Sequence, residues 1–301
     1  MTLADLTQRL SRADLLDGIG VYVAPDRVAL AHLRKRLFRV QLLEVAVHPL
    51  PPAGEVDARR QALLEAVSHF AGVRRGAVQR ACIVLPRRAA MMTRVVLPAA
   101  ARDNLGEVLS YEIENLVPLP KDEVHYQYVL REQRGEQRVE VLLASLPRTV
   151  VEEHTTLLEQ AGLRVRSLEL ACTALANYIL FCRGNEVGPL GLMIPEGDDL
   201  ELALVHEHRL CSSQVMPMDR LTGGTLEQAF VRQLAEEQLQ PSDVTMVGYG
   251  LPNAVAEYAQ WKDEDLLAMA AGRLDDDDGR LAGMDAAVLP AIGGALAGST
   301  A

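Results

Sequence analysis

The chain has 301 residues, 49% of them hydrophobic and 24% charged, which is long enough for two domains and apolar enough for a sizeable core. Asp and Glu number 41 against 30 Lys and Arg, so the formal net charge is -11. An acidic surface repels a phosphate backbone, which argues against nucleic acid as a partner. Cys82, Cys172, Cys182 and Cys211 form no C-x-x-C pair, so the sequence indicates neither a zinc ribbon nor a disulfide framework. This cysteine usage is typical of a reducing cytoplasm.

The first part of the chain predicts a β-meander followed by a helix. Residues 20–33 form two apolar runs around a turn at residues 24–26, and residues 38–47 form a third run rich in Val and Leu. Within residues 57–71 apolar side chains recur at helical spacing, and Gly72 supplies a stop.

The middle of the chain predicts strands and helices in alternation. Strands are expected at residues 81–85, 92–97, 124–131, 138–145 and 164–168, and helices at residues 100–115, 149–161 and 171–181. The clearest linker signal follows, because residues 184–189 contain Gly184, Gly188 and Pro189. We therefore place the main domain boundary at Gly188.

The second half repeats the order of the first. Strands are expected at residues 190–194, 200–205 and 210–215, a helix at 226–238, a strand at 244–247 and a helix of small residues at 286–296. A meander followed by further β/α units in each half predicts a duplicated α/β architecture.

Motifs of several enzyme classes are absent from the sequence. It has no G-x-S-x-G, H-E-x-x-H, G-x-x-x-x-G-K-[ST] or complete G-x-G-x-x-G, so no motif supports a hydrolase, zincin, P-loop or Rossmann protein.

His206 and His208 would share a strand face as a metal pair does, but they fall at an expected turn, and we favour a solvated turn. Residues 275–278 are four consecutive aspartates, whose side chains splay apart, so a solvated loop is favoured over a cation site. The basic run at residues 32–39 fits an anionic partner and a charged strand edge equally well.

One stretch of sequence resembles a known family. Residues 111–128 read Y-E-I-E-N-L-V-P-L-P-K-D-E-V-H-Y-Q-Y, which closely resembles a signature of PilM, the actin-like cytoplasmic protein of type IV pilus assembly. In that family a helix ends in a glutamate-rich segment of the I-P-F-P type, and a D-E-V strand follows. Residues 141–148 and 157–163 look like the next strand and helix of the family, and Leu168-Glu169 with residues 174–176 continue it. The cytoplasmic half of the type II secretion protein GspL is similar as well.

The resemblance implies an actin-like fold of two α/β halves around a nucleotide cleft. The first half would be residues 1–187, with a small inserted α+β subdomain at about residues 91–145, and the second half residues 188–301. The duplicated pattern of predicted elements agrees with this fold.

The first nucleotide motif of the resembled fold is altered here. Actin-like folds hold ATP through glycine turns of two hairpins, and the first turn is of the D-I-G type. In this chain Gly20 precedes Tyr22 at the position expected for Asp, and Ala24 stands at the position expected for Gly. Pro25 removes a backbone N–H that a phosphate would use.

The second motif is altered too. Ile194 replaces the metal-positioning Asp, and Glu196 brings a negative charge to the place where a phosphate would approach. The adenosine motif survives in part as Gly248 and Gly250. The resemblance therefore implies a degenerate cleft with no cofactor and no ATP hydrolysis, a pseudo-ATPase. The alternative is an active actin-like ATPase that binds ATP and magnesium, for which Asp26 and Asp198 could serve after a register shift.

The function implied is that of a scaffold or adaptor in an inner-membrane assembly platform of a type IV pilus or type II secretion system. The partner would be a short cytoplasmic peptide of a PilN-like membrane protein, received by a groove that involves the inserted subdomain. Ile113, Leu116, Val117 and Leu119 match the signature region and are our candidate docking residues, with ordinary core packing as the alternative.

The resemblance leaves further partners and the attachment to the membrane open. A secretion or pilus ATPase and a second copy of the chain are further partners to consider, and nucleic acid is not expected. The protein would be cytoplasmic and peripheral to the inner membrane through its partner. Alternatively, it would be the cytoplasmic part of a bitopic protein whose membrane span follows Ala301.

Overall fold

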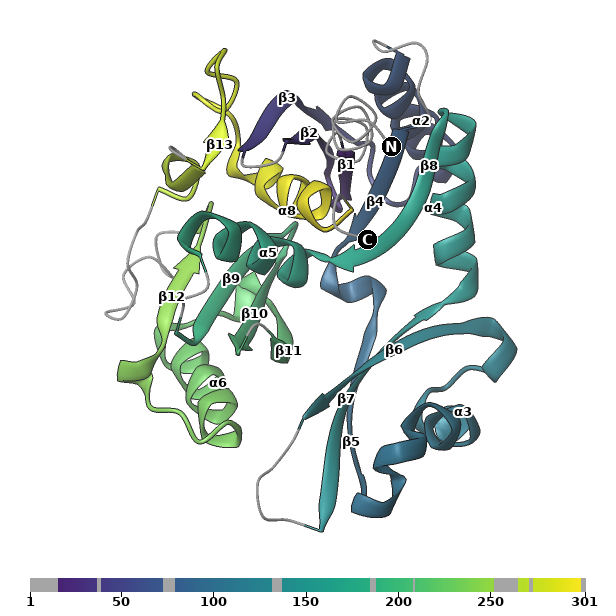
Figure 1. The fold of residues 1–301 in the computed structure, drawn as a ribbon, viewed down its shortest axis with the longest axis vertical. Helices are drawn as coiled ribbons and strands as arrows, with labels where there is room; N and C mark the ends of the chain where they lie inside the picture. Colours follow the sequence, from purple (N-terminus) through teal and green to yellow (C-terminus); the bar gives the residue numbers. More distant parts are fainter. Residues whose placement is uncertain are drawn as a thin grey trace, which may run out of the picture.

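The structure, a computed structural model, describes residues 16–36, 39–72, 79–131, 137–184, 188–207, 209–251, 265–270 and 273–298. These residues form one six-stranded, one four-stranded and one three-stranded β-sheet (Figure 1). None of the helices in the described ranges is long and apolar enough to cross a membrane.

The largest sheet begins with the predicted meander. Strands β1 (Leu16–Val23), β2 (Arg27–Arg36) and β3 (Arg39–Pro49) pair antiparallel. Helix α2 (Val56–Gly72) then leads to β4 (Gln79–Leu85), which lies parallel to β1, and β8 (Leu163–Leu170) lies parallel to β4. A right-handed crossover through a helix is the usual way to connect parallel neighbours.

The four-stranded sheet repeats this topology. Strands β9 (Leu190–Glu196), β10 (Asp199–His206) and β11 (Arg209–Pro217) form an antiparallel meander, helix α6 (Gly223–Glu236) follows, and β12 (Thr245–Gly248) lies parallel to β9. In both sheets the strand after the helix therefore lies beside the first strand of the meander. The duplication predicted from the sequence is confirmed.

The smallest sheet belongs to the inserted subdomain. Strand β7 (Arg138–Pro147) lies between β5 (Met91–Pro98) and β6 (Val124–Arg131), and both pairings are antiparallel. Helix α3 (Leu105–Leu116) packs on one face of this sheet and buries Leu109 and Ile113. A 3-10 turn over Ala99–Asn104 replaces the first part of the helix predicted at residues 100–115. Helix α4 (Arg148–Gln160) returns the chain to β8.

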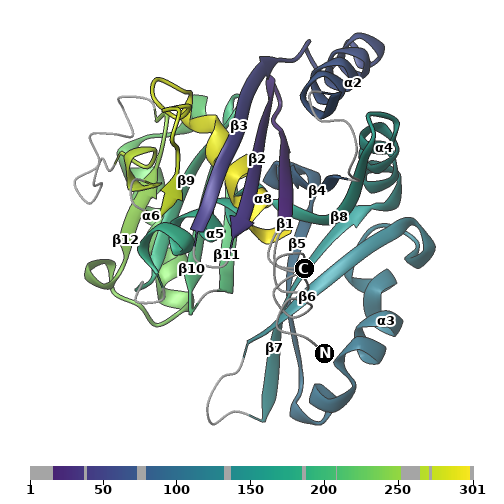
Figure 2. The ribbon, with the colours of Figure 1, turned by 45° about the horizontal axis from the view of Figure 1, so that its top comes forward.

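Two helices lie between the two larger sheets, as Figures 1 and 2 show. Helix α5 (Ala171–Arg183) contacts β4 and β8 of the first sheet and β9, β10 and β11 of the second. Helix α8 (Leu289–Gly298) contacts α5 and also β1, β2 and β4. One hydrophobic core therefore joins both halves through this helical layer.

The C-terminal segment departs from the predicted division of the chain. Strand β13 (Leu274–Asp275) pairs parallel with β3 of the first sheet, and α8 covers the same sheet. Residues 274–298 therefore pack with the first half rather than with the rest of residues 188–301. The reason is that α8 is a helix of small apolar residues, which can approach a sheet closely and bury nearly all of its surface there.

Glycine makes this approach possible. A Cβ atom on Gly20 of β1 would lie 1.8 Å from the carbonyl oxygen of Ala291, and a Cβ on Gly293 would lie 1.8 Å from the carbonyl oxygen of Ala174 in α5. A Cβ on Gly294 would lie 2.5 Å from Val84 of β4. No side chain fits at these distances, so α8 stays in place only with glycine at these positions.

We predict that Gly293→Ala lowers the free energy of unfolding by about 2 to 3 kcal/mol, the usual cost of forcing an extra methyl group into a close-packed interior. Urea unfolding followed by circular dichroism measures it. Gly54→Ala is the matched control, because a Cβ there would meet no heavy atom within 4 Å. Equal unfolding midpoints for the two variants would show that α8 is not packed as described.

Candidate functional site

The two hairpin turns that should flank a nucleotide lie close together. The β1–β2 turn contains Ala24, Pro25 and Asp26, and the β9–β10 turn contains Gly197, whose φ is 65°. A Cβ atom on Gly197 would lie 3.3 Å from the Cβ of Pro25, so the two turns face each other at close range. Little space therefore separates Pro25 from Gly197.

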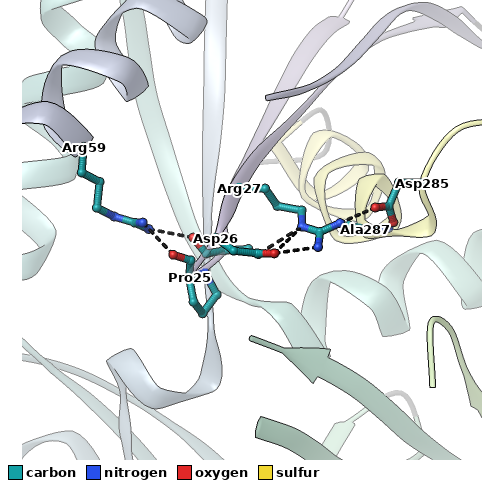
Figure 3. A network of polar contacts seen from close by, with 7 residues as sticks. Pro25, Asp26, Arg27, Arg59, Asp285 and Ala287 are labelled. Atoms are coloured by element: carbon teal, nitrogen blue, oxygen red, sulfur yellow. Dashed lines mark hydrogen bonds and ion pairs between the residues drawn. The ribbon is translucent and has the colours of Figure 1, made fainter. Parts of the chain in front are cut away.

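The first turn is held by an arginine from α2 (Figure 3). The guanidinium of Arg59 donates to the carbonyl oxygens of Ala24 at 2.7 Å, Pro25 at 2.6 Å and Pro51 at 3.0 Å. The turn thus directs two carbonyl acceptors at a cation of the protein itself, while Pro25 has no N–H to donate. Backbone N–H groups are the donors that bind phosphate in such turns, whereas this turn presents carbonyl oxygens, which attract a cation.

A second arginine ties the same turn to the C-terminal segment (Figure 3). The Nε of Arg27 donates to Asp26 at 3.0 Å, and its guanidinium also pairs with Asp285. Asp285 in turn accepts the N–H of Ala287 at 2.9 Å, just before α8 begins. The hydrogen bond from Arg27 lowers the pKa of Asp26. This exposed carboxylate is therefore already paired with an arginine of the protein.

A buried acidic pair lies on the facing hairpin. Glu196 of β9 is 2% exposed and Glu201 of β10 is fully buried. Both oxygens of Glu196 accept the backbone N–H of Arg87 at 3.1 Å, and the hydroxyl of Ser213 donates to Glu201 at 2.6 Å. Burial, together with the negative charge of Glu201, raises the pKa of Glu196 to about 8. Burial likewise raises the pKa of Glu201.

Two tyrosines complete this cluster. Tyr22 of β1 and Tyr249, which follows β12, are both buried, and desolvation raises the pKa of each phenol. The hydroxyls of Tyr22 and Tyr249 and the Oε2 of Glu201 have no hydrogen-bond partner among the described residues. Asp199 is also buried on this hairpin and pairs with Arg88. The cleft expected to hold a nucleotide is therefore filled by side chains that favour proton retention.

The structure gathers no metal site in its described part. No group of three or more His, Cys, Asp or Glu side chains there has an arrangement that could hold a metal ion. His206 lies at the end of β10, and Glu207, with φ of 50°, makes the turn that follows. His208, the second histidine singled out from the sequence, lies outside the described residues.

A groove of about 400 Å³ opens between the inserted subdomain and the first sheet. Consecutive residues of two strands form its sides, residues 125–129 of β6 and residues 166–170 of β8. Its lining also includes Leu142, Ala144 and Leu146 of β7, Met92 of β5 and Leu210 of β11. Strands β6 and β8 are each the last strand of their sheet within the described ranges, so each presents a free hydrogen-bonding edge.

Comparison with known proteins identifies the family. A family model described as type IV pilus assembly protein PilM matches residues 20–184, more than half of the chain. The chain belongs to the PilM family.

Several solved structures are similar to this PilM-family chain. A PilM–PilN type IV pilus biogenesis complex matches with a TM-score of 0.68 at 17% identity, covering 94% of this chain and 98% of that chain. The cytoplasmic domain of EpsL, from the type II secretion system of Vibrio cholerae, matches with a TM-score of 0.49 at 14% identity, covering 84% and 92%. The ethanolamine utilization protein EutJ from Carboxydothermus hydrogenoformans gives 0.42 at 10%, covering 98% and 96%. The first likeness and the duplicated sheets confirm the actin-like fold predicted from the sequence.

Three residues of the family signature, Ile113, Val117 and Val124, are buried in the core of the inserted subdomain, whereas most of residues 111–128 are exposed. Ile113 is fully buried and Val117 is 3% exposed, both against the sheet, while Leu116 and Leu119 are half-buried at the edge of that core. The structure therefore gives Ile113 and Val117 the role of core packing, the alternative that the sequence left open. Leu105, Ile113 and Val117 lie at multiples of four residues along the chain, and residues four apart share one helix face. This spacing was the sequence signal for their burial in the core.

The residues of the predicted PilM cleft are only partly brought together. Tyr22 and Glu196 meet in the buried cluster, and the turn that contains Ala24 meets the opposite turn. Gly20 lies apart from them beneath α8. Ile194 is fully buried in β9, where it packs in the core.

The adenosine motif and the residues that sequence reasoning missed lie beside this cluster. Gly248 is buried at the end of β12, and Gly250 has φ of 58°, a left-handed conformation that favours glycine.

Sequence reasoning missed Glu201 and Arg87. Glu201 had a usable signal, because a carboxylate within the apolar run of residues 200–205 must be buried, whereas the backbone N–H of Arg87 reaches Glu196 only through tertiary packing.

We predict that the protein loses stability as pH rises from about 5 to about 8. The unfolded chain releases the Glu196 proton near its ordinary pKa of 4.5, whereas the folded protein keeps it up to about 8, so stability is complete at low pH and falls as pH rises through this window. The slope reaches at most about 1.4 kcal/mol per pH unit for one proton.

Thermal unfolding of the protein and of Glu196→Gln at a series of pH values measures this effect. Glutamine keeps an amide oxygen for the Arg87 N–H but cannot titrate, so we expect a flatter profile. Glu227→Gln, at an exposed position of α6, is the control and should keep the slope of the unmodified protein. Identical slopes in all three proteins would remove Glu196 as the cause.

Proposed function

We propose that this PilM-family protein is an adaptor of the inner-membrane platform that assembles a type IV pilus. It docks a short cytoplasmic peptide of a PilN-like membrane protein and does not turn over ATP. The groove between the free edges of β6 and β8 is the observation that carries this proposal. The partner would hold the protein at the cytoplasmic face of the inner membrane.

The shape of the groove fits an extended peptide. Five residues of each strand line it, and five residues of extended chain span roughly 17 Å. An unpaired strand edge offers N–H and C=O groups to an added strand, while alternate side chains enter apolar pockets. Leu142, Leu146 and Leu168 supply apolar surface for those side chains. The solved complex to which this fold is similar joins PilM to PilN, which supports a PilN-like source for the peptide.

The docking position follows from the faces of the inserted sheet. One face of this sheet packs against α3 and contains the buried part of the family signature. The groove lies on the other face, where Gln127 of β6 stands opposite Ala144 of β7. Ile113 and Val117 of the signature therefore support the sheet from behind, and the last part of the signature, residues 125–128 of β6, lines the groove itself.

We predict that Ala144→Phe weakens binding of the peptide at least tenfold, about 1.4 kcal/mol, because the phenyl ring fills a groove that alanine leaves open. Fluorescence anisotropy with a labelled peptide from the cytoplasmic N-terminus of the PilN-like protein measures the affinity. Ala100→Phe is the matched control, since this exposed alanine of the same subdomain lies outside the groove lining.

Circular dichroism first confirms that both variants are folded. Full affinity in Ala144→Phe would place the docking site elsewhere. Loss of binding in Leu119→Asp together with full binding in Ala144→Phe would move it to the segment that follows α3.

The same proposal makes a prediction for nucleotide. Millimolar MgATP should not raise the melting temperature, because the two hairpin turns lie close together and Glu196 with Glu201 fills the space between the halves. A ligand at a hundred times its dissociation constant would add about 2.7 kcal/mol of stability, which a melting curve detects readily. A clear shift with MgATP that magnesium alone does not give would establish the alternative, an ATP-binding actin-like protein.

A further inference from the structure

Arg94 of β5 joins the inserted subdomain to the second half of the protein. Its Nε lies 2.7 Å from Glu140 of β7, and its two terminal nitrogens lie 3.1 Å from Glu236 and 3.2 Å from Glu237. The last two carboxylates come from the carboxyl end of α6. One guanidinium therefore contacts acidic side chains of two different parts of the molecule.

The end of α6 needs a cation from outside the helix. Glu236 is its last residue and Glu237 its C-cap, and no basic residue lies in its last turn. The carboxyl end of a helix carries partial negative charge, which acidic side chains reinforce and a cation offsets. The side chains of Glu237 and Glu140 are only 5% and 9% exposed, so water offsets little of their charge. Arg94 supplies the positive charge at this position.

A second arginine makes a link between the same two parts. Arg209 at the start of β11 donates from its guanidinium to the carbonyl oxygen of Leu130 in β6 at 3.2 Å. The next residue, Leu210, is 8% exposed and contributes to the lining of the groove. The second half therefore forms part of a groove whose sides belong to the inserted subdomain and the first sheet.

We propose that Arg94 and Arg209 form a latch that holds the second half against the inserted subdomain and thereby sets how the groove binds its peptide. The inference rests on the proposed function for the identity of the peptide, but the latch itself is a property of the free protein. With the latch closed, Leu210 is part of the groove wall. When the latch opens, Leu210 moves away from β6, and the peptide loses an apolar contact.

The charges at the latch make it sensitive to salt and to the peptide. The side chain of Arg94 is 30% exposed, so dissolved ions reach the cluster and screen it. Because linkage is reciprocal, a peptide that contacts Leu210 must hold the latch closed to the same extent that the latch strengthens its binding. Docking would therefore reduce motion between the second half and the inserted subdomain.

Hydroxyl-radical footprinting of the protein without peptide tests the latch directly. In Arg94→Gln, oxidation of Leu210 and Met92 should rise several-fold, and Arg94→Lys should give an intermediate rise, because an ammonium group cannot reach three carboxylates with the geometry of a guanidinium. Arg138→Gln, at an exposed arginine of β7, is the matched control. If Arg94→Gln does not fold, Glu236→Gln removes one contact of the cluster from its exposed side. Oxidation at the unmodified rate in a folded Arg94→Gln or Glu236→Gln protein overturns the latch.

The affinity of the peptide then tests control of the groove. We expect Arg94→Gln to bind the PilN-like peptide three- to tenfold more weakly, and the unmodified protein to approach that affinity at high salt. Unchanged affinity in a variant with raised oxidation would refute control of the groove by the latch. If the unmodified protein does not bind the peptide at all, the proposed docking function fails, and the footprint alone decides whether the latch exists.

Discussion

The close contact of helix α8 with strand β1 and helix α5 sets the geometry of the molecule. At Gly20 and Gly293 the backbone of one element approaches the other to a distance that leaves no room for any side chain. Since α5 also packs on the second sheet, this contact fixes how near the two sheets come to each other. The hairpin turns at the facing ends of the sheets then meet, with Pro25 against Gly197. The loss of a cleft follows from packing along the whole helical layer and not from the turns alone.

A cleft closed in this way changes the chemistry of its carboxylates. Glu196 and Glu201 are removed from water, and a charged carboxylate without solvent or a cation is strongly disfavoured. The backbone N–H of Arg87 and the hydroxyl of Ser213 supply neutral hydrogen bonds to these carboxylates. Keeping a proton removes the remaining cost of a buried negative charge. A nucleotide would bring several negative charges to the same place and would have to separate the turns to enter. The arrangement that lets this interior tolerate two glutamates thus opposes the entry of a phosphate, which is why we propose an adaptor and not an ATPase.

The sequence predicted those features that depend on local pattern. The two meanders follow from short runs of Val and Leu bounded by turn residues, and helix α2 from its apolar spacing, so the duplication was visible without coordinates. The altered turns at Pro25 and Glu196 were visible too, because they are changes of residue type at positions that the family resemblance defines. Contacts between distant segments were not visible. Nothing in the small-residue helix near the C-terminus says which sheet it covers, and no pattern brings β6 beside β8. Ile113 was a candidate docking residue with core packing as the alternative, because a family signature does not distinguish a shared binding surface from a shared core.

The groove is lined by three parts of the protein. One side of the groove is β6 of the inserted subdomain, the other is β8 of the first sheet, and Leu210 comes from the second half. An added strand must lie about 4.8 Å from the edge with which it pairs, so a small displacement of one part breaks a row of hydrogen bonds at once. Here the helical layer sets the spacing of the two halves, and Arg94 and Arg209 add polar contacts between the second half and the inserted subdomain. If the proposed peptide docks in this groove, the contacts of Arg94 and Arg209 would set how firmly it is held.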